Sequence, residues 1–212
     1  MTIPTPRFPV PEHVPANSST EKDGIVVGVG PVTVDAYIDF LCPFCRQFEA
    51  TSGPTLERLV DEELISLVHH PMGFLDELST NHYSSRASAA SGCASDQGRF
   101  LEFAAALFAH QPPEVGPGHT DEELVALGAL AGVTDPPFAA CVLTGTYLDW
   151  TTYVTRMAVG RGVGATPTVT VQGVPVPANP RTIVTAVDQA SNAPTRPEHE
   201  TRPENQWRTH WL

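Results

Sequence analysis

The chain has 212 residues, of which 41% are hydrophobic and 17% charged, and its formal net charge is −12 at a pI near 4.9. This length and composition suit one globular domain with a sizeable core. The acidity argues against proteins that need a basic surface, such as those that bind nucleic acid or anionic membranes. No apolar run approaches the roughly 18 residues that a membrane helix requires, so no membrane segment is expected.

Residues 1–22 are rich in proline and are expected to form an extended arm whose backbone is solvated. They lack the basic segment followed by an apolar segment that defines a secretory signal peptide. On that ground the chain is expected to be cytoplasmic. It would be extracytoplasmic if the sequence had been trimmed.

The first half of the chain carries strand and helix signals in alternation. Residues 25–40 are rich in β-branched side chains and are interrupted by a Gly-Pro pair, which predicts one or two strands. A helix is expected to begin at Pro43, because a proline in the first turn loses no hydrogen bond. Gly53-Pro54 is expected to interrupt that helix, which restarts along "PTLERLVDEEL". The stretch "LISLVHHP" predicts the next strand.

The second half begins with a helical region. Across residues 84–160, apolar side chains recur at three- and four-residue intervals, and Thr120 and Glu123 have the spacing of a capping box. "TPTVTVQGVPV" predicts a hairpin that turns at Gln172-Gly173, and "PRTIVTAVDQA" predicts a closing helix. The element order is therefore β, α, β, a helical segment, and then β, β, α.

The stretch "DFLCPFCRQFE" places Cys42 and Cys45 three positions apart, where a strand meets a helix. Such a pair can hold a metal, close a structural disulfide or perform redox chemistry. A zinc site usually needs two closely spaced pairs of ligands, whereas Cys93 and Cys141 lie 48 positions apart. The adjacent histidines of "VHHP" would point to opposite faces of a strand. A purely structural disulfide over so short a loop would add little stability.

The redox interpretation uses every feature of the motif. Cys42 would lie at a helix N-terminus, where free N–H groups stabilise an anion and lower the pKa of the thiol. Cys45, one turn further on, would resolve the mixed disulfide. Pro43 and Phe44 add no charge and leave an apolar rim suited to a hydrophobic peptide. No metal or cofactor is expected.

"DFLCPFC" after a strand, and "GVGATPTVTVQG" about 120 residues later, resemble the DsbA-like branch of the thioredoxin superfamily. The resemblance extends over roughly residues 25–190. It implies an α/β thioredoxin fold, βαβ followed by ββα, with an inserted helical domain. The expected parts are an N-terminal arm (1–22), a first thioredoxin-like part (23–75), the inserted helical domain (76–160), a second thioredoxin-like part (161–191) and a C-terminal tail (192–212).

The same resemblance implies further site residues. Pro167 would be the family's cis-proline, and Thr166 would contact the substrate backbone; the alternative is an ordinary trans proline opening a strand. Asp39 matches an acid that many members carry three positions before the first cysteine, and is a candidate for proton transfer or a plain surface acid. Thioredoxin-type proteins bury an acid six positions before that cysteine. This chain has Ala36 there, with Asp35 one position further back.

Cys93 and Cys141 resemble positions where relatives of actinobacterial type carry a structural disulfide. The alternative is two buried thiols that act as small hydrophobic side chains. Pairing would favour an oxidising compartment, which conflicts with the cytoplasmic expectation.

The predicted function is a thiol–disulfide oxidoreductase that exchanges a Cys42–Cys45 disulfide with cysteines of protein or peptide substrates, aided by an unidentified redox partner. One alternative is a cytoplasmic disulfide reductase, or an enzyme that depends on a low-molecular-weight thiol, on the same fold. Another is a redox-switched binding protein. Pro43-Phe44 lacks the histidine of the family's best-known oxidant, so a less extreme oxidant is expected.

Overall fold

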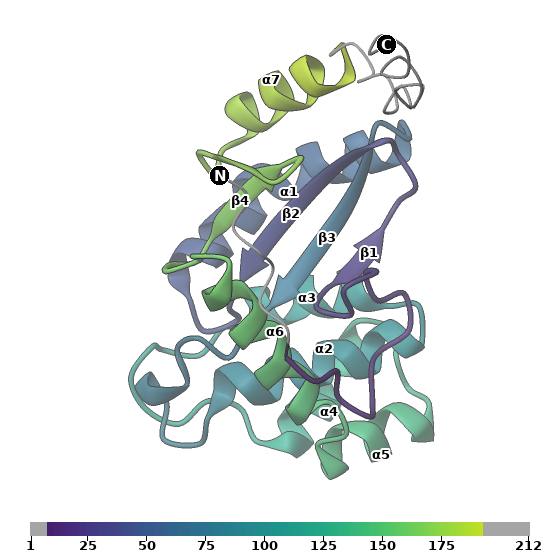
Figure 1. Cartoon of the computed structure of the whole chain (residues 1–212). Coiled ribbons are helices and arrows are strands. Elements are labelled where there is room, and N and C mark those ends of the chain that lie inside the picture. Colours follow the sequence, from purple (N-terminus) through teal and green to yellow (C-terminus); the bar gives the residue numbers. More distant parts are fainter. Residues whose placement is uncertain (1–7, 193–212) are drawn as a thin grey trace, which may run out of the picture.

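The computed structural model describes residues 8–192 and is built around a five-stranded sheet of order β1-β3-β2-β4-β5 (Figure 1). At its centre, β2 (Val32–Ile38) pairs in parallel with β3 (Ile65–Pro71) and antiparallel with β4 (Thr168–Val171). The edge strands β1 (Ile25–Val27) and β5 (Val174–Val176) pair antiparallel with β3 and β4. The helices are α1 (Pro43–Asp61), α2 (Tyr83–Asp96), α3 (Phe100–Ala109), α4 (Asp121–Leu130), α5 (Pro136–Thr144), α6 (Leu148–Gly160) and α7 (Pro180–Ser191), with a 3-10 turn at Asp76–Leu78.

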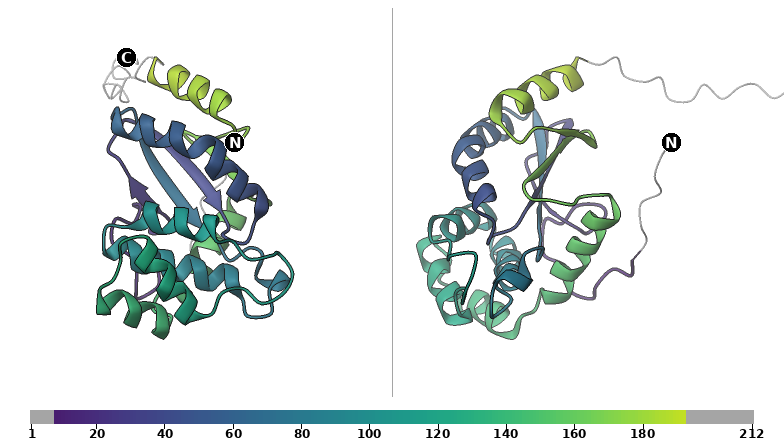
Figure 2. Two further views of the ribbon diagram at one scale, coloured as in Figure 1. Left: turned by 180° about the vertical axis from the view of Figure 1, so that it is seen from behind. Right: turned by 90° about the vertical axis from the view of Figure 1, so that its left-hand side faces the viewer.

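The helices divide between one face of the sheet and one end of it. α1 packs on β3, α7 packs on β2, β4 and β5, and the two helices contact each other (Figure 2). Helices α2 to α5 form a layer at one end of the sheet, and α6 returns from it to contact β3 (Figure 1). The order βαβ, inserted helices and ββα is the predicted one, with the initial strand region split into β1 and β2.

Local sequence signals account for several element ends. Thr120 and Glu123 form the predicted capping box at the start of α4, each side chain bonded to the other residue's backbone N–H. Gln172 and Gly173, with φ of 50° and 75°, form the predicted turn between β4 and β5. A type I′ hairpin turn requires positive φ at both central residues, which explains a glycine there.

The predicted interruption at Gly53-Pro54 is wrong. α1 runs without a break from Pro43 to Asp61, with Pro54 inside it. An internal proline removes a hydrogen bond and costs about 3 kcal/mol. Burial of Phe48, Leu56 and Leu59 along the same helix outweighs that cost, since each large apolar side chain contributes about 1.5–3 kcal/mol.

The N-terminal arm also differs from its prediction. The backbone of its described part, from residue 8, is not fully solvated: Pro15 is buried, and side chains of the inserted helices bind the arm's carbonyl groups. Trp150 Nε1 donates to the carbonyl of Lys22 at 2.8 Å, and Ser95 Oγ donates to that of Ala16 at 2.7 Å. The arm therefore packs along the inserted helices. Residues 1–7 of the arm and 193–212 of the predicted tail lie outside the described residues.

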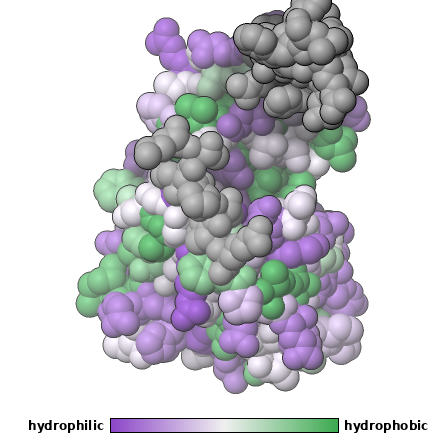
Figure 3. All heavy atoms as spheres, in the orientation of Figure 1, coloured by the Kyte–Doolittle hydropathy of each residue, from purple (hydrophilic) through white to green (hydrophobic). Residues whose placement is uncertain are grey.

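The surface seen in Figure 3 intermixes polar and apolar side chains. Within residues 8–192, no helix combines the length and the apolar character needed to cross a membrane.

Candidate active site

The two cysteines of "DFLCPFC" lie where β2 leads into α1. Cys42 is the N-cap residue of α1 and Pro43 its first residue. Both cysteines are free thiols and both are buried, with 4% and 0% of their surfaces exposed. A proline at the first helical position is pre-organised for the helix, so the sequence places Cys42 at the helix end and Cys45 one turn inside it.

The ATPTV segment supplies the opposite wall of the site. The Thr166-Pro167 peptide bond is cis. Cys42 Sγ lies 3.3 Å from the carbonyl oxygen of Thr166 and, as a thiol, donates to it. Two segments 124 residues apart therefore meet at this sulfur. Beside them Phe44 is 68% exposed, and Pro43 is partly exposed, so an apolar rim adjoins the sulfur.

The surroundings shift the pKa values of the two thiols in opposite directions. The pKa of Cys42 is lowered from 9.0 to about 6, first by a hydrogen bond from the Cys45 thiol and also by the backbone N–H groups of Cys45 and Phe44. Burial raises the pKa of Cys45 far above its ordinary value, and the neighbouring Cys42 raises it further. Near neutral pH the pair therefore consists of a nucleophilic thiolate and a protonated thiol.

Asp39 lies beneath this pair and is completely buried, so the alternative of a plain surface acid is wrong. Its carboxylate accepts hydrogen bonds from the N–H of Leu41 at 2.8 Å, Ser84 Oγ at 2.7 Å and the N–H of Leu75 at 2.9 Å. Its own N–H contacts Cys45 Sγ at 3.4 Å. Burial raises the pKa of Asp39 from 3.8 to about 6, in spite of these hydrogen bonds.

Sequence reasoning missed Ser84 as part of this arrangement. Ser84 is fully buried at the start of α2 and lies 45 residues from Asp39 in the chain. A serine in an alanine- and serine-rich helix carries no local signal. Only the docking of α2 against the β2–α1 turn identifies it.

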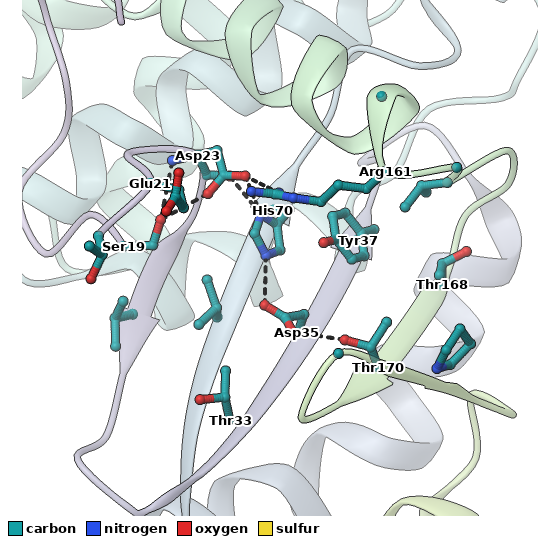
Figure 4. Close-up of a pocket in the computed structure, with 18 of the residues that line it drawn as sticks. Ser19, Glu21, Asp23, Thr33, Asp35, Tyr37, His70, Arg161, Thr168 and Thr170 are labelled. Carbon is teal, nitrogen blue, oxygen red and sulfur yellow. Dashed lines mark hydrogen bonds and ion pairs between the residues drawn. The ribbon is translucent and has the colours of Figure 1, made fainter. Parts of the chain in front are cut away.

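Asp35 lies elsewhere, in a cavity of about 900 Å³ on the sheet face away from α1 (Figure 4). His70 Nε2 lies 3.1 Å from Asp35 Oδ1, and Thr170 Oγ1 donates to Asp35 Oδ2 at 2.7 Å. Nearby, the buried Asp23 pairs with Arg161 at the end of α6. Asp35 therefore joins β2 to β3 and β4, and does not replace the buried acid of thioredoxin-type proteins.

The neighbouring histidine points the other way, as predicted for a strand. His69 packs against Phe100, with ring centroids 5.0 Å apart, and burial lowers its pKa to about 4. His69 and His70 therefore share no site. Within the described part of the chain, no three His, Cys, Asp or Glu side chains are grouped to hold a metal.

The second cysteine pair lies within the inserted helices. Cys93 of α2 and Cys141 of α5 form a disulfide, with Cα atoms 5.9 Å apart. The alternative of two separate buried thiols is therefore wrong.

Comparison with known proteins agrees with this geometry. The thioredoxin family model matches residues 21–189. The chain belongs to the thioredoxin family. It is similar to reduced DsbA from Mycobacterium tuberculosis, with a TM-score of 0.71 and 32% identity over 80% of this chain and 93% of that one. DsbG, a disulfide bond oxidoreductase from the same organism, matches with a TM-score of 0.69 and 32% identity over 82% and 86% of the two chains.

This thioredoxin-family chain is therefore DsbA-like, and its structural neighbours are thiol–disulfide oxidoreductases. Among curated proteins, the serine/threonine-protein kinase PknE of Mycobacterium tuberculosis is 32% identical over 133 residues. That alignment covers 58% of this chain and 23% of the kinase. The chain thus spans less than a quarter of the length of the curated relatives it matches.

Proposed function

We propose that this DsbA-like protein exchanges a Cys42–Cys45 disulfide with cysteines of protein substrates. One observation carries the proposal: Cys42 Sγ, with a pKa of about 6, lies at the start of α1 and 3.3 Å from the carbonyl oxygen before a cis-proline. The thiolate is the species that attacks disulfides and leaves most readily from them. The site therefore combines a stabilised thiolate at Cys42 with the backbone of Thr166-Pro167 next to it.

In the oxidising direction, a substrate thiolate attacks Cys42 Sγ, and the Cys42–Cys45 bond breaks. Cys45 leaves with the electron pair and takes a proton. A second substrate thiolate then attacks the substrate sulfur of the mixed disulfide and releases Cys42 as a thiolate. The substrate loses two electrons and the enzyme gains them, so a redox partner must reoxidise the enzyme. The reverse sequence reduces substrate disulfides.

The substrate is proposed to be an extended peptide that contacts the backbone of Thr166 beside Pro167. Pro43 and Phe44 would provide the apolar surface on the other side of the sulfur, because Phe44 is largely exposed and uncharged. DsbA-like oxidoreductases act on protein substrates that contain cysteines, and this arrangement suits such a chain better than a small charged thiol.

Asp39 is proposed to supply the proton that Cys45 takes. Cys45 has a strongly raised pKa and must be protonated as it leaves. Asp39 is the buried acid whose backbone contacts this sulfur, and its own pKa of about 6 lets it exchange protons near neutral pH.

The direction of the reaction follows from how strongly the thiolate is stabilised. A pKa of about 6 for Cys42 favours the reduced form of the enzyme, and so favours oxidation of substrates. It is less extreme than a pKa near 4, in keeping with the absence of a histidine between the cysteines. The Cys93–Cys141 disulfide supports a working place in an oxidising compartment.

Two assays on one preparation test the proposal. The purified chain should refold a reduced multi-cysteine substrate, and it should reduce insulin in the presence of a thiol reductant. Cys42→Ser should lose both activities, while Cys93→Ser/Cys141→Ser should keep them. If the wild type showed no turnover in either direction, the pair would be a switch in a binding protein and the proposal would be wrong.

A further inference from the structure

The turn that presents Cys42 is held from two sides. From below, the carboxylate of Asp39 binds the N–H of Leu41 at 2.8 Å, and the carbonyl of Asp39 accepts the N–H of Cys42 at 3.1 Å. These bonds lie within the first thioredoxin-like part. They involve neither the carbonyl group of Phe40 nor that of Cys42, and a buried carbonyl group needs a hydrogen-bond donor.

Gln111 binds both of these carbonyl groups. It follows α3 in the inserted helical domain, 69 residues from Cys42. Its side-chain Nε2 donates to the carbonyl of Phe40 at 2.9 Å and to that of Cys42 at 3.0 Å. An amide NH₂ group has two N–H donors, so both bonds form at once. The carbonyl of Cys42 also accepts the N–H groups of Cys45 and Arg46, which begin α1.

The segment that carries Gln111 is itself fixed to the inserted domain. Asn81 Nδ2 donates to the carbonyl of Gly118 at 3.0 Å, and Asn81 Oδ1 accepts the N–H of Gly118 at 3.1 Å. The N–H of Thr80 donates to the carbonyl of Gly116 at 3.0 Å. The Gln111 side chain thus extends from an anchored segment to the active-site turn.

We propose that Gln111 is a positioning residue for the nucleophile, through which the inserted helical domain holds Cys42 in the geometry that stabilises its thiolate. This inference rests on the proposed thiol–disulfide exchange at Cys42. Gln111 acts through the backbone of the turn and takes no part in bond making. Its effect is confined to the active-site turn, because both hydrogen bonds of its side chain end on the three residues from Phe40 to Cys42.

The consequence follows from what stabilises the Cys42 sulfur. The anion is favoured by the Cys45 thiol and by the N–H groups of Phe44 and Cys45. These contacts depend on the orientation of the residue that starts the helix. Without Gln111, the carbonyl of Phe40 loses its side-chain donor, whereas the carbonyl of Cys42 keeps the N–H groups of Cys45 and Arg46. The turn can then rotate so that the Phe40 carbonyl reaches water. The thiolate then loses part of its stabilisation.

The test is the rate of alkylation of Cys42 by iodoacetamide, measured from pH 4 to pH 9 in wild type and Gln111→Ala. Only the thiolate reacts, so the rate profile reports the thiolate fraction. At pH 5 the variant should react about three- to tenfold more slowly. At pH 9, where the thiolate has formed in both proteins, the rates should agree within about twofold. A lowered rate by the same factor at every pH, or an unchanged profile, would overturn the proposal.

Two further variants keep the test decisive. Gln97→Ala makes the same change at the end of α2, away from the turn, and should leave the profile unchanged. Gln111→Glu keeps the length of the side chain but points carboxylate oxygens at two carbonyl oxygens, so it should reduce the rate at pH 5 at least as much as alanine does. If the alanine variant does not fold, as judged by its thermal unfolding, the Gln111→Glu profile decides in the same way.

Failure of this inference differs from failure of the proposed function. Alkylation needs no protein substrate, so the profile can be measured even if the wild type lacks exchange activity. An active wild type with an unchanged Gln111→Ala profile would refute the role of Gln111 alone.

Discussion

The molecule carries two cysteine pairs that illustrate opposite uses of the same side chain. Cys93 and Cys141 come from two helices of the inserted domain and are joined across 48 residues of chain. Cys42 and Cys45 are neighbours on one helix, both as free thiols. The first pair closes a long loop. The second pair closes almost none, so its disulfide gains little from chain entropy and can be opened and closed at modest cost.

Burial alone does not distinguish the pairs, because Cys42, Cys45 and Cys93 are all buried. The difference lies in what surrounds the sulfur. Cys42 meets the N–H groups at the start of α1 and a carbonyl beside a cis-proline. Cys93 lies inside α2, three residues before its C-terminal end, where the backbone N–H groups are engaged within the helix. Free N–H groups at the N-terminal end of a helix lower the pKa of a thiol and make it reactive, whereas N–H groups bonded within the helix do not.

Replacing the resolving cysteine should give the largest effect. In Cys45→Ser, Cys42 can still attack a substrate disulfide, but nothing within the enzyme can release the mixed disulfide. Steady-state insulin reduction should fall at least about 1000-fold. A covalent one-to-one adduct with a cysteine peptide disulfide should accumulate and be seen by mass spectrometry.

The matched control is Cys141→Ser, which leaves Cys93 as a free thiol in a helix interior. It should form no such adduct under the same conditions. An adduct on Cys93 at a comparable rate would mean that position on the helix does not govern reactivity, and the contrast between the pairs would fail.

Removing the other pair should affect stability and leave chemistry intact. Cys93→Ala/Cys141→Ala should lose roughly 4 kcal/mol of unfolding free energy by the loop-entropy model. Urea unfolding without reductant measures this loss. Exchange activity of the folded variant should stay within about twofold, because the bond joins α2 to α5 inside the inserted domain.

The comparison variant is Cys42→Ser/Cys45→Ser, which removes the short loop. Its loss of stability should be smaller than that of the alanine pair. Equal urea midpoints for the wild type and Cys93→Ala/Cys141→Ala would show that the long loop contributes nothing to the fold.

Much of this contrast could be predicted from the sequence because it depends on local signals. Proline after Cys42, a β-branched run before it and a Gln-Gly hairpin later in the chain each determine an element over a few residues. The order of those elements agrees with the thioredoxin fold and its helical insertion, which the resemblance to the DsbA-like family implied. Resemblance to a family added the cis bond before Pro167 and the pairing of Cys93 with Cys141, which spacing alone left open.

The remainder depends on contacts between distant segments. The helix continues through Pro54 because its apolar face is buried, which a local breaker rule does not include. Ser84 and Gln111 meet the active-site turn from 45 and 69 residues away. Each is an ordinary polar residue in its own segment. Their roles follow from the docking of the inserted helices, so they became visible only in three dimensions.

Asp39 provides the smallest but most specific prediction, a pH dependence of stability. Burial raises its pKa in the folded protein to about 6, above 3.8. Between these pH values Asp39 is ionised in the unfolded chain but still protonated in the folded protein, which favours unfolding. The free energy of unfolding of the wild type should therefore fall as pH rises from about 4 to about 6. The expected loss is about 2–3 kcal/mol, and no further loss should occur above that window. Asp39→Asn cannot titrate and should lack this dependence.

The measurement is urea unfolding at several pH values with the oxidised protein, in which Cys42 does not titrate. His69 also titrates near pH 4 in the folded state, but it is present in both proteins, so its contribution cancels in the difference. Ser84→Ala removes a hydrogen bond that stabilises the carboxylate, and should therefore extend the window to higher pH. Identical pH profiles of stability for the wild type and Asp39→Asn would mean that burial does not raise the pKa of Asp39. Asp39 would then be ionised near neutral pH and could not donate a proton to Cys45.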